Sequence, residues 1–279
     1  MRLLKSNKTV LLTGCSSGIG YFCAHALHKD GYKVFATCRD AKDVKRLQDE
    51  GLHAYRLDLC DSNSIAEALA WVVLQTDAKI DILFNNAAFG QPGAVEDLKR
   101  SVLIEQFETN VFGTQELTNV VLPFMRKNGY GRVIYNSSVL GFAAMKYRGA
   151  YNASKFAIEG LADTMRLELK GSGIDVVLIE PGPIRSEFRK NALAKFQEHI
   201  DIAVSAHKEV YEKTLERLRG SGDAPFTLAP EAVYAVLLKA IEAKKPRIRY
   251  AVTFPTKLFG ALKRILPDRA MDFILGSVD

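Results

Sequence analysis

Short apolar runs rich in β-branched residues alternate along this chain with longer segments whose apolar residues recur every three or four positions. That alternation is typical of a parallel sheet with crossover helices, because parallel strands cannot be joined by tight hairpins. We therefore predict an α/β fold, a doubly wound parallel sheet of about seven strands with helices on both faces. The expected strands are Thr9–Thr13, Lys33–Thr37, Ala54–Leu57, Ile80–Phe84, Gly131–Asn136, Asp175–Glu180 and Arg247–Ala251.

The segments between these strands carry the helical pattern. The clearest are Ser64–Gln75, Ile104–Met125 and Ala153–Lys170, each with apolar residues three and four positions apart. One span interrupts the rhythm of short connections, because residues 185–230 include a long charged stretch of helical period, Ala192–Arg219, followed by glycine and proline. An insertion of this length usually covers a functional site, so we expect it to cover the substrate.

The length of 279 residues and the 48% hydrophobic content allow a large core, and we expect one domain over residues 1–279. No run of about 18 uncharged apolar residues occurs, so the sequence predicts no membrane-spanning helix. The segment before Val10 is too short and too charged to hold the apolar part of a signal peptide. We therefore expect a cytoplasmic protein.

The four cysteines and five histidines are scattered, without the short paired spacing that metal sites and redox motifs use. We expect buried thiols and no metal site. The net charge of +6 is concentrated between Lys239 and Arg269, where nine Lys or Arg face Glu242 and Asp268, a local excess of +7. The rest of the chain is close to neutral and the basic part has no recognised reading motif, so we expect no nucleic-acid partner.

A glycine-rich turn from Thr13 to Gly20 follows the first expected strand and opens the first helix. Glycines there let the backbone approach a pyrophosphate closely, while the helix N-terminus supplies amide donors and a partial positive charge. Glycines also mark ordinary loops. The position of this turn between the first strand and the first helix is what favours a dinucleotide site.

A chain that selects NAD usually has a carboxylate at the end of the second strand, where it binds the ribose hydroxyls. In this chain Arg39 occupies that position and Asp40 follows it. A guanidinium suits a 2′-phosphate, so we predict NADP as the cofactor; a plain loop arginine, with Asp40 on the ribose, is the alternative. Asp58, after the third strand, would accept from the adenine amino group or simply form a turn or helix cap. Asn86 and Ala87 end the fourth strand, where backbone groups would face the cofactor ribose.

Tyr151 and Lys155 lie four residues apart on an expected helix and so share one face. A nearby ammonium group favours the phenolate, so we expect Lys155 to lower the pKa of Tyr151 from its ordinary value of about 10 toward neutrality. The phenol would then be a usable general acid. Both residue types are common on protein surfaces, so the pair gains its meaning from the rest of the chain.

With these motifs in place, the chain resembles the short-chain dehydrogenase/reductase family over essentially its full length. The tyrosine and lysine of the family match Tyr151 and Lys155. The family's catalytic serine, thirteen residues before the tyrosine, matches Ser138, and its helix asparagine matches Asn110. The resemblance is closest to NADP-dependent reductases that include hydroxysteroid and retinol dehydrogenases and bacterial aldehyde reductases. It implies a Rossmann-type fold and hydride transfer between the nicotinamide C4 and a carbonyl carbon.

By this resemblance, Ser16 and Arg39 would contact the 2′-phosphate and the backbone at Ile184 would meet the nicotinamide carboxamide. The expected cofactor-binding residues are Gly14, Ser16, Ser17, Gly18, Ile19, Gly20, Arg39, Asp58, Leu59, Asn86, Ala87, Tyr151, Lys155, Pro181, Gly182 and Ile184. Ala88 departs from the family's glycine, and we expect a small local shift, because a methyl group is tolerated where φ stays negative. Ser186 stands where threonine is frequent and keeps the hydroxyl.

The resemblance also implies a role for each catalytic residue. Tyr151 would be the general acid in reduction, while Lys155 lowers its pKa and holds the nicotinamide ribose. Ser138 would donate a hydrogen bond to the carbonyl oxygen as negative charge develops there. Asn110 would anchor a water that links Lys155 to solvent. The residues themselves leave alternatives open, since Ser138 could merely cap a turn and Asn110 could be a helix-interior polar group bonded to backbone.

The expected pocket residues near these motifs are apolar, namely Phe89, Phe142, Met145 and Phe188. They favour a hydrophobic carbonyl substrate of the aldehyde, retinoid or steroid type. The alternative is that these side chains pack as core beneath the insertion. The rival function is a dinucleotide-sensing regulator without turnover, against which the complete catalytic set argues.

The tail, residues 254–279, separates apolar and basic residues at helical spacing, most clearly over Lys257–Leu266. A basic amphipathic helix can lie on an anionic membrane surface, but more often its apolar face packs on its own domain or on a neighbouring subunit. Peripheral membrane contact and packing therefore stand as the two alternatives. The family resemblance implies a homodimer or homotetramer that pairs through Ile104–Met125 and Ala153–Lys170.

Overall fold

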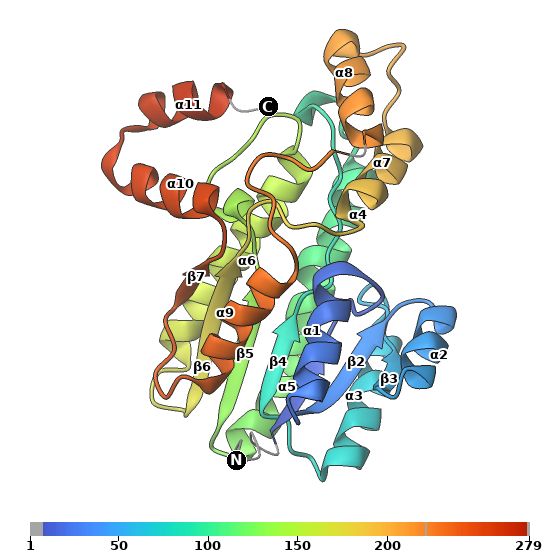
Figure 1. Ribbon diagram of the computed structural model, residues 1–279, viewed down its shortest axis with the longest axis vertical. Helices are drawn as coiled ribbons and strands as arrows, with labels where there is room; N and C mark the ends of the chain where they lie inside the picture. Colours follow the sequence, from blue (N-terminus) through green and yellow to red (C-terminus); the bar gives the residue numbers. More distant parts are fainter. Residues whose placement is uncertain (1–7, 221, 278–279) are drawn as a thin grey trace.

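A seven-stranded parallel sheet forms the centre of the computed structural model, which describes residues 8–220 and 222–277 (Figure 1). The strands are β1 (Thr9–Leu12), β2 (Lys33–Cys38), β3 (His53–Arg56), β4 (Ile82–Asn85), β5 (Gly131–Asn136), β6 (Ile174–Glu180) and β7 (Arg249–Ala251). Their order across the sheet is β3-β2-β1-β4-β5-β6-β7, and every neighbouring pair is parallel. The predicted doubly wound parallel sheet is therefore confirmed.

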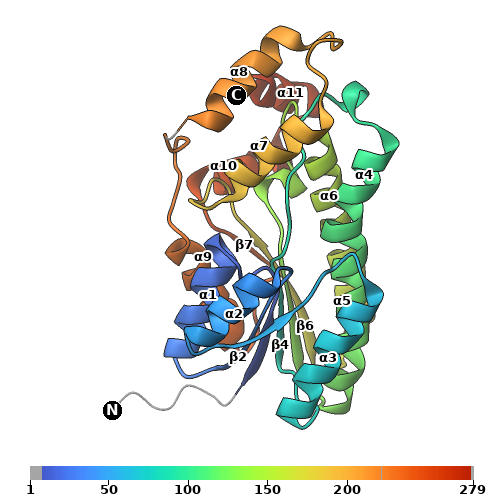
Figure 2. The same cartoon turned by 90° about the vertical axis from the view of Figure 1, so that its right-hand side faces the viewer.

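Helices cover both faces of this sheet. They are α1 (Gly18–Lys29), α2 (Ala41–Asp49), α3 (Ser62–Thr76), α4 (Arg100–Phe107), α5 (Thr114–Lys127), α6 (Gly149–Glu168), α7 (Phe188–His199), α8 (Lys208–Arg219), α9 (Glu231–Glu242), α10 (Phe254–Ile265) and α11 (Asp268–Gly276). Short turns complete the elements: η1 (Val95–Asp97) and η3 (Val139–Gly141) are 3-10 turns, and η2 (Glu108–Gly113) is a π-helical turn. Figure 2 shows α1 and α9 on one side of the sheet and α3, α5 and α6 on the other.

Two apolar cores lie on the opposite faces of the sheet, because a parallel sheet covered by helices is buried on both sides. Side chains alternate along a strand, so neighbouring residues of β1 belong to different cores. Val10 and Leu12 pack with residues of α1 and α9, whereas Leu11 packs with residues of α3, α5 and α6. This two-sided burial explains why the strands appear in the sequence as continuous apolar runs.

The chain changes direction across the sheet between β1 and β4, which are neighbours although two strands separate them in sequence. Because the two strands are parallel, the turns that follow Leu12 and Asn85 meet at one edge of the sheet. In open α/β sheets, ligands bind in the crevice outside these carboxyl ends. Helices α7, α8, α10 and α11 lie beyond the same edge, at the top of Figure 1.

The insertion contains two helices, so the single helical segment predicted over Ala192–Arg219 is wrong. Helix α7 begins at Phe188 and ends at His199, and Ile200 then takes an extended backbone and is buried. The side chain of Asp201 accepts a hydrogen bond from the amide of Ala203 at 3.0 Å, which forms a turn that interrupts the helix. Both helices have the predicted helical periodicity, but the turn at Asp201 separates them.

The long helix predicted over Ile104–Met125 consists of α4, the π-helical turn η2 and α5. A π turn widens the helix by one residue and often occurs at functional sites. It brings Gly113 against the chain after β3, where an added Cβ would lie only 1.8 Å from the carbonyl oxygen of Leu59. Helix α6 begins at Gly149, four residues before the predicted start at Ala153, and therefore contains Tyr151.

The C-terminal helices pack on the body of the domain. Phe259 of α10 and Leu275 of α11 join a cluster with Val139 and Leu140 of η3. The packing alternative is therefore confirmed for this face of the tail, and the part of α10 that faces solvent still exposes Ile265. No helix within residues 8–220 and 222–277 is long and apolar enough to cross a membrane.

A buried guanidinium stabilises the far end of the sheet. The Arg132 side chain, 2% exposed, donates to the backbone carbonyls of Ala240, Ile241 and Ala243 at the end of α9, and to Asp175 at 2.6 Å. These carbonyls lie at a helix C-terminus, where a cation is favourable. One side chain of β5 thus joins α9 to the neighbouring strand.

We expect Arg132→Met to lower the free energy of unfolding by about 2–4 kcal/mol, because it leaves buried carbonyls without donors. Urea unfolding followed by circular dichroism measures this loss. Asp175→Asn is the matched control. It keeps the guanidinium on the carbonyls and removes a carboxylate that is 42% exposed, so the expected loss is below about 1 kcal/mol. Equal losses in the two variants would contradict the role of the carbonyl contacts.

Candidate active site

The glycine-rich turn after β1 has the backbone geometry that requires glycine. Gly14 and Gly18 have φ angles of +71° and +56°, in the left-handed region that favours glycine. A Cβ added at Gly20 would lie 2.1 Å from the carbonyl oxygen of Gly14. Ser17 is the N-cap of α1 without using its side chain, and Ile19 packs on the core of that face. The turn therefore exposes backbone amides at a helix N-terminus, a site suited to an anion.

The end of β4 holds this turn in place. The Asn86 side chain donates to the carbonyls of Thr13 at 3.0 Å and Gly14 at 3.2 Å, and it accepts from Asn136 at 2.9 Å. The amides of Asn86 and Ala87 both donate to the Thr13 hydroxyl at 3.0 Å. Asn86 is thus a support of the turn, a role the sequence did not indicate.

The Pro-Gly segment after β6 meets the turn from the other side. A Cβ added at Gly18 would lie 2.8 Å from the Cβ of Ser186, and one added at Gly182 would lie 2.2 Å from the Thr253 hydroxyl. Pro181 accepts from the amide of Val139 at 2.8 Å, and Ile184 forms an isolated parallel bridge with Leu228. The structure therefore brings the two predicted cofactor-binding segments into contact.

Two basic residues lie near the turn, and the sequence analysis named only Arg39. Arg39 follows β2 with its side chain 72% exposed and 3.9 Å from the Asp40 carboxylate. Arg46 of α2 donates to the carbonyl of Ser16 at 2.6 Å and lies over the Tyr21 ring. Sequence reasoning missed Arg46, because nothing in the pattern of α2 separates it from the other basic residues of that helix.

Asp58 lies after β3 and forms a turn. Its carboxylate accepts from the amide of Cys60 at 3.0 Å, while its own amide donates to the Ser64 hydroxyl at 3.0 Å. The turn-forming alternative is therefore what the structure shows. Leu59 is buried beside η2. At Ala88 the backbone stays outside the left-handed region, so the methyl group is tolerated there as expected.

The four predicted catalytic residues come from three elements that converge beyond the carboxyl ends of β4 and β5. The Lys155 ammonium donates to the carbonyl of Asn136 at 2.8 Å and lies 5.6 Å from the centre of the Tyr151 ring. Ser138 follows β5, and its hydroxyl lies close enough to Tyr151 to oppose the rise in the pKa of the phenol. Asn110 in η2 donates to Ser154 of α6 at 3.1 Å. Segments far apart in the sequence thus meet at one site.

The structural alternatives for Ser138 and Asn110 are both confirmed. The Ser138 hydroxyl accepts from the amide of Leu140 at 3.1 Å, so it caps η3 as well as contacting the tyrosine. The Asn110 side chain donates to the carbonyl of Phe89 at 2.9 Å and accepts from its amide at 3.1 Å. Asn110 therefore fixes the loop after β4.

Burial controls the protonation of the catalytic pair. Burial raises the pKa of Tyr151 to about 12, against the opposing effects of the Ser138 hydroxyl and the charge of Arg148. Burial lowers the pKa of Lys155 to about 8, against the raising effect of the Glu159 carboxylate. The prediction that Lys155 lowers the pKa of Tyr151 is therefore wrong here, because the loss of solvent outweighs neighbouring charge.

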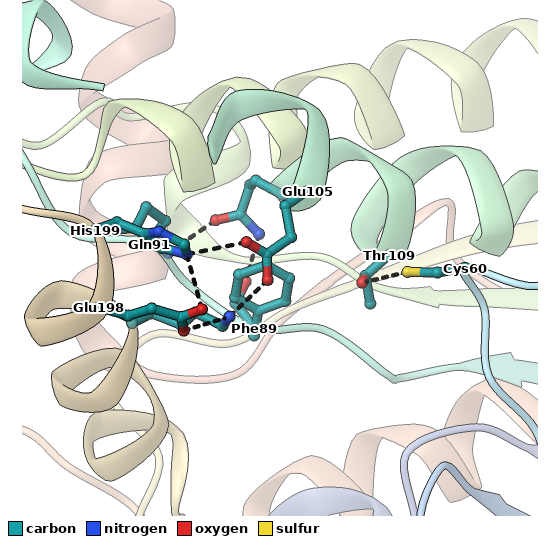
Figure 3. Close-up of polar contacts among 9 residues, drawn as sticks. Cys60, Phe89, Gln91, Glu105, Thr109, Glu198 and His199 are labelled. Carbon is teal, nitrogen blue, oxygen red and sulfur yellow. Dashed lines mark hydrogen bonds and ion pairs between the residues drawn. The ribbon is translucent and has the colours of Figure 1, made fainter. Parts of the chain in front are cut away.

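The insertion lies over this site. The ring of Phe188, the first residue of α7, contacts the Tyr151 ring edge-on at a centroid distance of 5.2 Å. Farther along α7, Glu105 of α4 accepts from Lys195 at 2.6 Å and pairs with His199 at 3.0 Å. Figure 3 shows Glu105 facing His199 close to the Phe89 loop. The polar contacts with Glu105 thus hold α7 against α4, and a ring contact joins Phe188 to Tyr151.

The other expected pocket residues divide between site and core. Phe142 and Met145 pack, together with Tyr151, at the border of the cluster formed by η3 and the C-terminal helices. The Phe89 ring is partly buried beneath the Lys195 ammonium at 5.7 Å. The surface around the tyrosine is therefore mostly apolar, with α7 on one side and α10 on the other. Within residues 8–220 and 222–277, no group of His, Cys, Asp or Glu is placed to hold a metal ion.

Comparisons with known proteins find relatives along most of this chain. A family model described as short chain dehydrogenase matches residues 8–197. The uncharacterized oxidoreductase YbbO of Escherichia coli is 41% identical over 96% of this chain and 94% of its own length. Human 17-beta-hydroxysteroid dehydrogenase type 1 is 34% identical over 93% of this chain and 80% of its own. The structure of the actinorhodin polyketide ketoreductase with NADPH superposes with a TM-score of 0.72 at 26% identity, covering 90% of this chain and 97% of that one.

We expect Gly20→Ala to weaken dinucleotide binding at least about tenfold, or about 1.4 kcal/mol, because the new Cβ forces the turn to shift. Fluorescence titration with NADPH measures the dissociation constant. Gly160→Ala is the matched control, since a Cβ at that helical position meets nothing within 4 Å. An unchanged dissociation constant in Gly20→Ala would show that the turn is not part of the binding site.

Proposed function

Because this chain belongs to the short-chain dehydrogenase family of oxidoreductases, we propose that it transfers hydride reversibly between NADP(H) and a hydrophobic carbonyl or alcohol. The convergence of Tyr151, Lys155 and Ser138 beyond the carboxyl ends of the sheet, beside a glycine-rich turn, is the observation that carries the proposal. The position agrees with the general rule for ligand sites in open α/β sheets.

The residues at the turn fit a nicotinamide dinucleotide. The amides at the N-terminus of α1 and the tight backbone at Gly14 and Gly20 suit a pyrophosphate, since a side chain at either glycine would prevent the backbone from packing this closely. Pro181, Gly182 and Ile184 would hold the nicotinamide end. The bound cofactor supplies or accepts the hydride, and the protein provides the geometry and the proton.

Tyr151 is suited to donate the proton in carbonyl reduction. With a pKa of about 12, its phenol is protonated at neutral pH, which is the form that a general acid requires. The Ser138 hydroxyl beside it would donate a hydrogen bond to the substrate oxygen as negative charge develops. With a pKa of about 8, Lys155 is mostly an ammonium group at neutral pH, and it would hold the nicotinamide ribose.

A preference for NADP over NAD is supported by the charge at the end of β2. The exposed guanidinium of Arg39 is available to a 2′-phosphate. Arg46 lies beside Ser16 but already pairs with Asp43 and Glu50, so Arg39 carries this part of the proposal. The polyketide ketoreductase with a similar fold was solved with NADPH. Guanidinium groups match phosphate geometry better than they match a ribose hydroxyl.

The substrate is proposed to be an apolar carbonyl compound. The Phe188 ring contacts the Tyr151 ring, and Phe142 and Met145 pack against the apolar cluster formed by η3, α10 and α11. The human relative is named as a hydroxysteroid dehydrogenase, an activity on a large apolar alcohol. We also propose a dimer or tetramer, because η2 exposes Phe112 and α6 exposes Phe156, on the pair of helices that would form the interface.

We expect Tyr151→Phe to lower turnover at least about 100-fold, the usual scale for losing a general acid, with little change in NADPH affinity. The measurement is NADPH oxidation across a panel of apolar aldehydes and ketones that includes retinal and a steroid ketone. Tyr130→Phe, at the opposite end of β5, is the control and should retain normal turnover. Near-normal turnover in Tyr151→Phe would refute the acid assignment. Tight NADPH binding without turnover by the unmodified protein would favour a dinucleotide-sensing regulator.

We expect Arg39→Ala to weaken NADPH binding at least about tenfold while leaving NADH affinity within about twofold, because only NADPH carries the 2′-phosphate. Parallel fluorescence titrations measure both constants. Lys45→Ala removes the same charge from α2, where the ammonium pairs with Asp49, and should change neither. Equal losses for both cofactors in Arg39→Ala would contradict phosphate recognition by this residue.

A further inference from the structure

Helix α10 has a second apolar face besides the one that packs on the domain. The packed face carries Phe259, which is 7% exposed and lies in the cluster formed with η3 and α11. The second face carries Phe254, Leu258 and Ile265, whose exposed fractions are 57%, 40% and 78%. Residues at this spacing lie one above another along a helix, so the three side chains form one stripe that points into solvent. We call this stripe the outer face of α10.

An aromatic pair extends the outer face at its N-terminal end. The Phe226 ring packs on the Phe254 ring at a centroid distance of 5.3 Å, and Phe226 is itself 59% exposed. Its φ angle of +61° lies in the left-handed region, which is unfavourable for a bulky residue. Such outliers cluster at functional sites. The chain thus keeps a large ring in solvent at a position where a smaller residue would be less strained.

Basic residues flank the outer face. Helix α10 contains Lys257, Lys263 and Arg264 and no acidic residue. Lys257 and Arg264 are seven positions apart and directly precede Leu258 and Ile265, so they run along one side of the apolar stripe. Lys263 points the other way and donates to a backbone carbonyl of the domain. The outer face therefore combines exposed apolar side chains with two cations.

These two cations are available to an anionic partner. Within residues 8–220 and 222–277, neither Lys257 nor Arg264 makes a hydrogen bond or an ion pair. Burial raises the pKa of Glu180 to about 7, and the charge of Arg264 opposes that rise from a distance. Asp268 and Asp272 of α11 offset part of the charge, and α10 and α11 together keep an excess of +2, from four Lys or Arg against these two carboxylates.

This combination matches an anionic lipid surface. Apolar side chains can enter the boundary of the acyl chains while the flanking cations meet the headgroups. A helix of 12 residues is too short to cross a hydrocarbon core of about 30 Å, so α10 would lie in the plane of the surface. Figure 1 shows α10 and α11 at an outer corner of the molecule, where a flat surface can approach them. A second copy fits less well, because pairing this face with itself would bring its cations together.

We propose that the outer face of α10, extended by Phe226, docks the protein on an anionic lipid surface. The apolar side chains provide the burial, and Lys257 and Arg264 provide the preference for anionic lipids. This binding is independent of turnover, because none of these residues belongs to the proposed catalytic or cofactor-binding set. The packed face of the same helix borders the apolar cluster that Tyr151 joins, so docking would bring that cluster close to the lipid.

The first test removes one exposed apolar side chain. The full chain is sedimented with vesicles of phosphatidylcholine that contain about 30 mol% phosphatidylglycerol. We expect binding, and we expect Ile265→Gln to lower the partition coefficient about tenfold, because an isoleucine side chain no longer leaves water. Leu74→Gln is the matched control. Leu74 is 84% exposed on α3, at the other end of the molecule, so its loss should change binding by less than about twofold.

The second test removes the flanking charge. The double variant Lys257→Gln, Arg264→Gln should bind the same vesicles at least about tenfold more weakly, and about 0.5 M salt should weaken the unmodified protein in the same way. The double variant Lys170→Gln, Lys244→Gln loses equal charge after α6 and α9, at the opposite end of the sheet, and should bind normally. Tyr151→Phe should also bind normally, which separates this inference from the proposed function.

A direct optical reading comes from Ile265→Trp. The chain has one tryptophan, Trp71 on α3, so a new indole on the outer face reports its own surroundings. Its emission should shift to shorter wavelength with anionic vesicles and stay unchanged with phosphatidylcholine alone. Absence of that shift, equal binding to both kinds of vesicle, or normal binding by Ile265→Gln would overturn the inference. A dimer in sedimentation velocity that Ile265→Gln dissociates, without vesicle binding, would overturn it in favour of a second copy on this face.

Discussion

Parallel pairing of β1 with both β2 and β4 is the constraint on which the rest of the structure depends. It forces the chain to cross the sheet between β3 and β4, and it places the turns after β1 and β4 side by side. The Asn86 side chain can therefore bond to the carbonyls of Thr13 and Gly14. The glycine-rich turn, the start of α6 and the insertion all lie at the carboxyl ends of these strands, where open α/β sheets bind ligands.

Burial then determines the chemistry of the groups placed there. Lys155 is buried, and Tyr151 is partly buried by Phe188 and the cluster around η3, so the pKa of Tyr151 rises to about 12 and that of Lys155 falls to about 8. A protonated phenol beside an ammonium group suits proton donation to a carbonyl oxygen. Burial of charge also has to be compensated elsewhere in the domain, and Arg249 pairs with the carboxylates of Glu159, Asp163 and Glu180.

Local sequence determined the elements and the motifs. Apolar runs such as Val10–Leu12 have to be buried on both faces, so they predicted the central strands, and Gly14, Gly18 and Gly20 predicted a turn that excludes side chains. The spacing of Tyr151 and Lys155 placed both on one helix, since helical periodicity is a property of neighbouring residues. Periodicity failed where a single side chain, that of Asp201, ended a helix.

Tertiary structure alone decided how charge and solvent are distributed. Arg46 reaches Ser16, and Arg249 gathers Glu159 and Glu180, across separations of 30, 90 and 69 residues that no local pattern records. The pKa of Tyr151 was misjudged for the same reason, because a lysine four residues away is visible in the sequence but burial is not. Sequence fixes which groups are neighbours along a helix, whereas the energy of a charge depends on everything packed around it in space.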